Sequence, residues 1–499
     1  MITNLKPSQT ELKIFLLTMV VCVAAKGNAL FQLSYSTDDF FSMLTPMNLN
    51  VYFMDGRFGW ALLSTLNHSL GAVAPFTNTF FIFLYMACLV LAGLIVCRIW
   101  RITDNMILST LVVLFINIHP YQAELFSFKV NALYNAFSIL FAYIGLYYSE
   151  LKIKPIFLTS FCMSFALSIY QLSLNPIVIT LCFAIVFEIV RQSINNNSSN
   201  WKQILHKTKL LPRMVTIWLG VFFYLIGNKV LQNILHTIPS ERFQFISIYD
   251  IVHRLIEIKD VMLKMFFLPE PIMPIALKVI LAILGFLAIV VCTSKIFSGN
   301  LNKGTMVNFL LVLVVLFISL MSTVGVPLIV KTWWPVARVL SSIGYFWAGV
   351  ISLAFFSVSK KIHLIVVILS SIVLFGFAGI NNRIYTDQVR LNMRDFHKAN
   401  RIIYRLENHP EFSRVQRVTI IGGDWNFPSA IDTAIGDMNI SAFSKSWSKL
   451  NILKELSGYN FAQATENEQE KAEAYCSGAP KWPAPESLII DGGLCIICL

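Results

Sequence analysis

Long runs of hydrophobic residues alternate with short polar stretches over the first 380 residues of the chain. A helical run of about 20 apolar residues is long enough to cross the hydrocarbon core of a bilayer. We count about eleven such runs, with approximate centres at Val20, Ala87, Val113, Phe141, Cys162, Ile185, Phe222, Ala282, Val312, Gly349 and Val367. The pattern predicts an all-α polytopic membrane protein over residues 1–380, in which the first run is a retained span because no signal-peptide cleavage site follows it.

The remaining residues, 381–499, have a different pattern that is typical of a soluble domain. They hold 13 Lys and Arg against 14 Asp and Glu, and their apolar positions are periodic rather than continuous. The periodicity predicts helices at Ile384–Leu406 and Ser446–Leu456, a strand at Arg417–Ile421, and a terminal hairpin of residues 487–490 and 494–499. We therefore expect a small C-terminal α/β domain at 381–499.

The charges give this membrane protein an orientation. Hydrophobic residues make up 56% of the chain and charged residues 13%, whereas a soluble protein carries about 25% charge. The net charge of +12 is explained by cations in alternate loops rather than by nucleic-acid binding. These cations are Lys6, Lys13, Arg98, Arg101, Lys152, Lys154, Arg191, Lys202, Lys207, Lys209, Arg213, Lys295, Lys303, Lys360 and Lys361. The positive-inside rule then predicts a cytoplasmic N-terminus and an extracytoplasmic C-terminal domain.

Few residues indicate cofactor or metal chemistry. The sequence has no phosphate-binding glycine loop and no metal-ligand spacing, so no cofactor and no metal are expected. Of the nine cysteines, Cys476 is able to pair with Cys495 or Cys498 if the tail lies in an oxidising compartment.

Two adjacent carboxylates, Asp38 and Asp39, begin the first predicted external loop. One interpretation is structural, with Thr37 or Asp38 capping a helix. The other is a general base that removes a proton from an acceptor hydroxyl. Arg57 follows in the same loop, between two glycines that allow close backbone approach, and is suited to pair with an acid or a phosphate.

Other external cations are candidate phosphate ligands. Lys331 and Arg338 flank a Trp-Trp pair that is typical of an interfacial aromatic belt, and both either snorkel to lipid phosphates or bind a lipid-linked substrate. Lys129 is a further candidate. Within the spans, Lys26 lies close enough to a helix end to snorkel.

Several short stretches, in this order and spacing, resemble a known family. They are Ser36-Thr37-Asp38-Asp39-Phe40 after the first span, Tyr170-Gln171 in a short external turn, and Pro480-Lys481-Trp482-Pro483 before the terminal hairpin. Together with the layout of spans and tail, they resemble the phage-type, serotype-converting O-antigen glucosyltransferases of enteric bacteria.

The resemblance implies a GT-C-like enzyme of the bacterial inner membrane with a periplasmic C-terminal domain. Its donor would be undecaprenyl-phosphate glucose, its acceptor a sugar of the lipid-linked O-antigen, and its reaction an inverting displacement. A flippase and a donor-synthesising glucosyltransferase would be its functional partners. The family's acidic residue corresponds to Asp38 or Asp39, and its C-terminal lysine to Lys481, which either binds phosphate or docks the tail.

Two alternatives stay open from the sequence. One is transfer of another polyprenyl-phosphate sugar, such as a mannosyl or arabinosyl group. The other is transport of a polysaccharide or lipid-linked sugar. A transporter is expected to have two repeated halves and buried polar residues near the middle of its spans, and neither is visible in the sequence.

Overall fold

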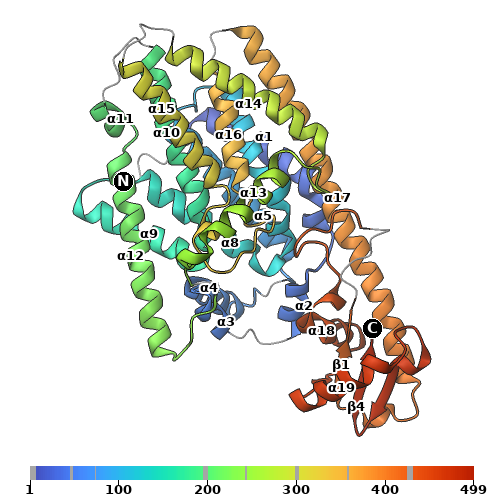
Figure 1. Cartoon of the computed structure of the whole chain (residues 1–499). Coiled ribbons are helices and arrows are strands. Elements are labelled where there is room, and N and C mark those ends of the chain that lie inside the picture. The colour runs from blue at the N-terminus through green and yellow to red at the C-terminus, as the bar shows by residue number, and fades with distance from the viewer. Residues whose placement is uncertain are drawn as a thin grey trace.

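The computed structural model describes residues 7–44, 49–72, 75–194, 201–241, 244–297, 303–356, 359–423 and 431–499 (Figure 1). Within these ranges, eight helices are long and apolar enough to span a membrane. They are α1 (Gln9–Phe31), α5 (Asn78–Trp100), α8 (Lys129–Tyr147), α10 (Leu174–Ile194), α12 (Leu210–Ile234), α14 (Ile275–Ile296), α15 (Lys303–Met321) and α17 (Lys360–Glu407).

Three further apolar segments complete the helical body. A bent pair makes a ninth span if it is counted as one, and two apolar helices are shorter than the rest. The segments are α6 (Met106–Ile118) bent against η2 (Pro120–Gln122) and α7 (Ala123–Ser127), α9 (Ile153–Ile169), and α16 (Ile343–Ala354). Every predicted span centre lies in a helix, but only eight or nine helices of the described chain meet the length and hydropathy of a span. The 12 residues of α16 reach only about 18 Å.

The remaining elements are short helices and four strands. They are α2 (Thr37–Leu44), α3 (Leu49–Met54), α4 (Phe58–Ser69), α11 (Trp201–Lys207), α13 (Ile251–Phe266), α18 (Ser446–Ser457), α19 (Glu466–Gly478), β1 (Arg417–Ile421), β2 (Ala462–Gln463), β3 (Leu488–Asp491) and β4 (Leu494–Cys498).

The bend after α6 explains an unexpected buried lysine. At the bend before Pro120, the N–H groups of Tyr121 and Gln122 bond to His119 instead of continuing the helix, so the carbonyls of Asn117 and Ile118 need other donors. Lys26 Nζ donates to the Asn117 carbonyl at 2.6 Å, and Asn381 Nδ2 donates to the Ile118 carbonyl at 2.8 Å. The expectation that Lys26 snorkels is therefore wrong, because its side chain is fully buried and completes the hydrogen bonding of a broken helix.

The residues after α17, from Asn408 onward, form what we call the C-terminal unit. Its four-stranded sheet has the order β2-β1-β4-β3, with β1 parallel to β2 and β4 and with β3 antiparallel to β4. The predicted strand at 417–421, the terminal hairpin and the helix at Ser446 are confirmed. Of the two open disulfide pairings, the structure has Cys476–Cys498.

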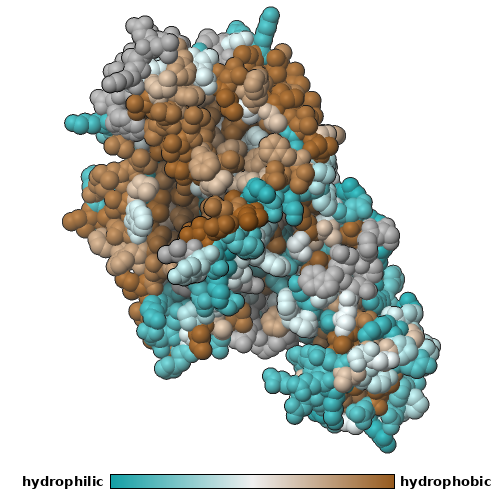
Figure 2. Space-filling view, viewed as in Figure 1, coloured by the Kyte–Doolittle hydropathy of each residue, from teal (hydrophilic) through white to brown (hydrophobic). Residues whose placement is uncertain are grey.

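α17 joins the helical body to the C-terminal unit without a break. Figure 1 shows it running along one edge of the body and continuing beyond it to the sheet. The predicted division between residues 380 and 381 falls inside this helix. In Figure 2 the helical body is mostly hydrophobic on the visible face, while the C-terminal unit is mostly hydrophilic.

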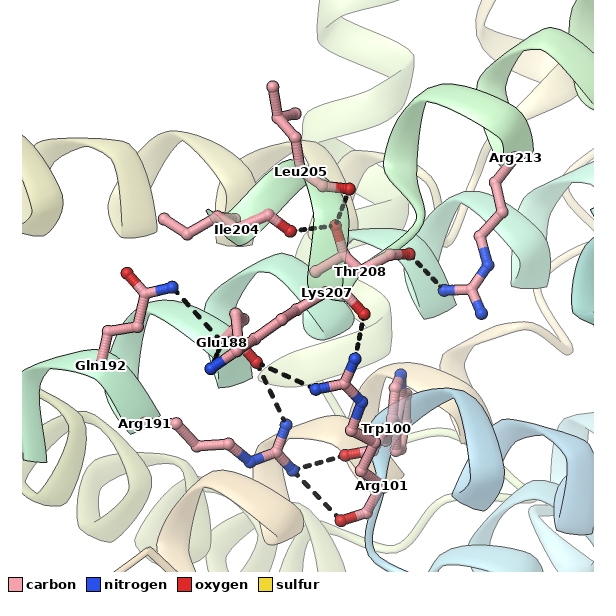
Figure 3. A network of polar contacts seen from close by, with 10 residues as sticks. All are labelled: Trp100, Arg101, Glu188, Arg191, Gln192, Ile204, Leu205, Lys207, Thr208 and Arg213. Atoms are coloured by element: carbon pink, nitrogen blue, oxygen red, sulfur yellow. Dashed lines mark hydrogen bonds and ion pairs between the residues drawn. The ribbon is translucent and has the colours of Figure 1, made fainter. Parts of the chain in front are cut away.

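Contacts between loops sort them into two groups at the two ends of the body. At one end, Glu11 pairs with Arg98, and Glu188 lies within ion-pair distance of Arg101 and Lys207 (Figure 3). At the other end, α2 packs on α18, and the loops around Glu124 and Arg338 meet. We call the second group the cavity end. Within each group, the residues named here belong to segments that the sequence predicts on one side of the membrane.

Candidate active site

Two neighbouring cavities lie at the cavity end of the helical body. The polar cavity has a volume of about 530 Å³ and is lined by residues of α2, α3, α4 and α8 and by the C-terminal unit. The apolar cavity, about 270 Å³, is lined mostly by aliphatic residues of α9, α10 and α12 and of the loop before α16. The residues that line both cavities are Arg57, Tyr170, Thr332, Trp334 and Arg338. The cavities therefore meet at two arginines and two aromatic rings.

Only one of the two adjacent carboxylates faces this space. Asp38 lines the polar cavity, beside Tyr52 and Arg57. Its negative charge contributes, after burial, to raising the pKa of the Tyr52 hydroxyl. Tyr52 stacks on Trp60 with ring centroids 3.5 Å apart, which gives the cavity an aromatic wall.

Asp39 is fully buried and holds α2 in place. Its Oδ2 accepts from Ser36 N and Ser36 Oγ, both at 2.8 Å, and its Oδ1 accepts from Val130 N at 2.8 Å in the first turn of α8. Ser36 Oγ in turn accepts from Asp39 N at 3.2 Å, so Ser36 caps α2 in place of the predicted Thr37 or Asp38. Burial raises the pKa of the Asp39 carboxyl to about 6, although Lys129 and these donors oppose the shift.

Arg57 stands where the cavities meet, and its backbone is fixed by the turn that precedes it. Gln171 Nε2 donates to the Asp55 carbonyl at 3.0 Å and to the Gly56 carbonyl at 3.3 Å. Gly56 has a φ of +69°, a conformation that favours glycine. Gly59 also has the predicted close approach, because a Cβ there would lie 2.1 Å from Ser168 Oγ of α9.

The Arg57 guanidinium has no carboxylate partner within the part of the chain that the structure describes. Its Nε is buried without a hydrogen bond, and its Cζ lies 5.5 Å from the Tyr170 ring centroid. A guanidinium with unused donors at the mouth of two cavities is suited to bind a phosphate through paired hydrogen bonds.

Arg338 is held differently, between two carboxylates. Its backbone N donates to Glu124 Oε2 at 2.6 Å, its guanidinium pairs with Glu124 Oε1, and its NH2 group donates to Asp437 Oδ2 at 2.8 Å. Burial disfavours the charged form of Arg338, but Glu124 and Asp437 outweigh this effect and raise its pKa. Its charge is thus already balanced by the protein.

The other three predicted cations line neither cavity. Lys129 is buried and donates to the Phe126 carbonyl at 3.0 Å. Lys331 pairs with the exposed Glu241 at 2.8 Å, and Lys481 donates to the Cys476 carbonyl at 2.7 Å near the end of α19. Each of these three lysines therefore has a structural partner and does not contribute to the lining of the site.

The C-terminal unit contributes residues to the site that no pattern in the sequence indicates. Asp437, Lys445 and Trp447 line the polar cavity, as does Trp334, which the sequence suggests as part of an aromatic belt. No spacing in the sequence links these tail residues to the loops that they meet. Among the described residues, no three His, Cys, Asp or Glu side chains lie together as a metal site would require.

A match to a known protein family identifies the kind of protein that carries this site. The model described as Glucosyl transferase GtrII matches residues 27–355, about two thirds of the chain. The chain belongs to the GtrII glucosyl transferase family. A comparison with curated proteins and one with solved structures found no significant match.

Membership makes the chain a membrane glucosyltransferase, as the resemblance of its short motifs implies. The part matched by the GtrII family includes α2 with Asp38, the turn with Arg57, and Arg338. It also includes every residue that lines the apolar cavity. The C-terminal unit of this GtrII glucosyl transferase lies outside the match.

Proposed function

We propose that the protein transfers glucose from undecaprenyl-phosphate glucose to a sugar of the lipid-linked O-antigen, at the periplasmic face of the bacterial inner membrane. The observation that carries this proposal is the junction of an apolar and a polar cavity at Arg57. A polyprenyl-phosphate sugar has the same three parts in the same order: an apolar chain, one phosphate and one sugar.

The donor would lie across the junction. Aliphatic side chains of α9, α10 and α12 offer the first isoprene units a surface away from water. Arg57 is the cation with unused donors, and we assign it the phosphate. The glucosyl group then lies in the polar cavity, where Tyr52, stacked on the buried Trp60, offers aromatic surface to a sugar ring.

The reaction needs a base on the acceptor side and a stabilised leaving group. Asp38 removes the proton from the acceptor hydroxyl as that oxygen attacks the anomeric carbon. The new carbon–oxygen bond forms while the bond to the phosphate oxygen breaks, which inverts the anomeric centre. Undecaprenyl phosphate leaves as an anion beside Arg57, and the proton stays on Asp38.

Asp39 has a positioning role in this account. Its oxygens tie α2 to the first turn of α8, so the neighbouring Asp38 is presented to the cavity on a fixed helix. Because one residue step on a helix turns the side chain by about 100°, two adjacent acids take different directions. In this assignment Asp38 is the base, and Asp39 holds the helix that carries it.

The location and partners follow from the donor. Loops of the cavity end carry fewer cations than the alternate loops, and the positive-inside rule then favours a location outside for this end. A donor made in the cytoplasm must then be synthesised by a separate glucosyltransferase and moved across the membrane by a flippase.

A reconstituted transfer assay tests the proposal. Wild-type protein in liposomes receives labelled undecaprenyl-phosphate glucose and lipid-linked O-antigen, with undecaprenyl-phosphate mannose and arabinose as parallel donors. We expect label on the O-antigen from the glucose donor only. Transfer from another donor would assign a different sugar, and movement of intact glycolipid without transfer would indicate a transporter.

A further inference from the structure

One wall of the polar cavity comes from outside the region that the family shares. Asp437, Lys445 and Trp447 of the C-terminal unit line this cavity, and none of the residues lining the apolar cavity comes from that unit. The family match ends at residue 355. The part of the site that would hold the donor lipid and the part contributed by the tail are therefore separate in the chain.

Segment 431–447, which carries these three residues, is fixed on α17 rather than loosely attached. Thr433 Oγ1 donates to Asp387 Oδ2 at 2.9 Å. Ser441 Oγ donates to Asp395 Oδ1 at 2.6 Å, and Ala442 N donates to Asp395 Oδ2 at 2.7 Å. Asp387 and Asp395 are both buried. The segment thus reaches the cavity in a fixed position.

Asp437 joins this segment to the loop that borders both cavities. Its Oδ2 accepts from the Arg338 guanidinium at 2.8 Å and from Trp334 Nε1 at 3.3 Å, and its Oδ1 lies 3.5 Å from Lys445 Nζ. Gly436 packs so closely on Val336 that a Cβ would lie 2.7 Å from it. Asp437 is therefore occupied by the protein and supports the wall rather than binding a sugar.

Trp447 is the group of the wall that a ligand is able to contact, with the ammonium of Lys445, which also pairs with Asp437, beside it. Trp447 is 43% exposed, so part of its ring is open to a ligand. Lys445 Nζ lies 5.5 Å from its ring centroid. An aromatic face with an ammonium donor beside it fits the apolar face and the hydroxyl groups of a pyranose ring.

We infer that segment 431–447 forms the acceptor subsite, in which Trp447 and Lys445 hold an uncharged sugar ring and determine which acceptor is used; this inference rests on the proposed function. The charge balance supports an uncharged ring. Glu124 and Asp437 neutralise Arg338, and Asp437 also pairs with Lys445. Arg57 is the cation left over among the described cavity residues, and the donor phosphate takes it.

This division explains why the two substrates would use different parts of the chain. The proposed lipid and phosphate contacts lie within residues 27–355, the region that the family model matches. The proposed acceptor contacts lie in the C-terminal unit, outside that match.

Kinetics with each substrate varied in turn test the inference. We expect Trp447→Ala to raise the KM for the lipid-linked acceptor about tenfold, the size of one lost aromatic contact, and to leave the donor KM unchanged. Trp447→Phe keeps an aromatic face and is expected to restore most of the acceptor KM. Lys445→Gln is an independent variant that should shift the same constant.

Trp482→Ala is the matched control. Trp482 is a second tryptophan of the C-terminal unit, stacked against Arg405 at 4.3 Å and lining neither cavity of the site. Its replacement should leave both KM values unchanged. Thermal unfolding of each variant shows whether the fold is kept. If Trp447→Ala does not fold, the acceptor KM values of Trp447→Phe and Lys445→Gln decide the test.

The outcomes separate this inference from the proposed function. If the wild-type protein transfers sugar from no polyprenyl-phosphate donor, the proposed function fails. If the wild-type protein transfers glucose but the Trp447 and Lys445 variants change the donor KM or neither KM, the acceptor assignment is overturned and the proposed function stands.

Discussion

The two ends of the helical body both gather cations, but they use them differently. At the end opposite the cavities, Arg101, Arg191 and Lys207 all lie within 4.0 Å of Glu188, whose side chain is only 2% exposed (Figure 3). At the cavity end, Arg338 is balanced by carboxylates, whereas Arg57 has none among the described residues and opens onto two cavities.

The difference shows what separates a structural charge cluster from a binding site. The Glu188 cluster connects α10 with α11 and with the turn after α5, and Arg101 and Arg191 also donate to backbone carbonyls there. Such a cluster satisfies its own charges and holds loops together. A binding site needs space, and a charge that the protein leaves for the ligand.

The largest expected effect separates Asp38 from its neighbour. Asp38→Asn removes the base, so we expect kcat to fall by about 10²–10⁴-fold. Asp39→Asn keeps one of the two acceptor oxygens that hold α2, so part of the support remains and the loss should be smaller. Transfer rates of both variants, compared at equal amounts of folded protein, check the order. A larger loss in Asp39→Asn would reverse the assignment of base and support.

A smaller effect is expected at the junction of the cavities. Arg57→Gln keeps much of the volume but removes the charge beside the donor phosphate, and we expect kcat/KM for the donor to fall about 10–100-fold. The KM for the acceptor should change little. An unchanged donor kcat/KM would show that the phosphate lies elsewhere.

The pH dependence of stability tests the buried Asp39. Its pKa of about 6, against 3.8 for the free group, means that the folded protein holds a proton that the unfolded chain releases between these values. Stability from this group is therefore present below about pH 4 and declines as the pH rises to about 6, by at most about 3 kcal/mol. Unfolding of wild type and Asp39→Asn in detergent across pH 4–7 measures the difference, which should be flat above pH 7.

The opposite end of the molecule should affect stability without affecting chemistry. Glu188→Gln leaves three cations without their shared carboxylate, and we expect a loss of roughly 1–3 kcal/mol in the free energy of unfolding. Donor and acceptor KM should stay at wild-type values. A selective change in either KM, with stability intact, would give this cluster a role in substrate binding.

The smallest effect is expected for an exposed cation of the cavity end. Lys331 pairs with Glu241, and both side chains are more than half exposed, so Lys331→Gln should change stability by less than about 1 kcal/mol and leave transfer unchanged. A marked loss of transfer would show that Lys331 contributes to the reaction although it lines neither cavity.

Periodic features of the fold could be predicted from the sequence. Helix positions, the strand at 417–421 and the terminal hairpin follow from local apolar patterns, and each is present. The acidic pair and Arg57 could be proposed as site residues because charged residues beside aromatic residues and glycines are unusual in a loop next to a membrane span. The choice between the acids was not predictable, since it depends on Ser36 capping α2 and on the backbone of α8.

Features that depend on distant contacts were missed. Lys26 is buried because a bend some 90 residues later leaves a carbonyl in need of a donor. Lys331 was proposed as a ligand from its position, yet it pairs with Glu241, 90 residues earlier in the chain. Asp437 and Trp447 reach the cavity only through the packing of the tail on α17, for which the sequence contains no local pattern.

If the proposed function is correct, the two cavities hold the two halves of one lipid-linked donor. Photocrosslinking locates the lipid half, with undecaprenyl-phosphate glucose that carries a diazirine on its first isoprene unit. We expect labelled peptides from the walls of the apolar cavity, around Leu172, Val221 and Val339, and suppression of the labelling by unmodified donor. Labelling that is spread over the outer helices and is insensitive to that competition would show that the apolar cavity does not hold the donor lipid.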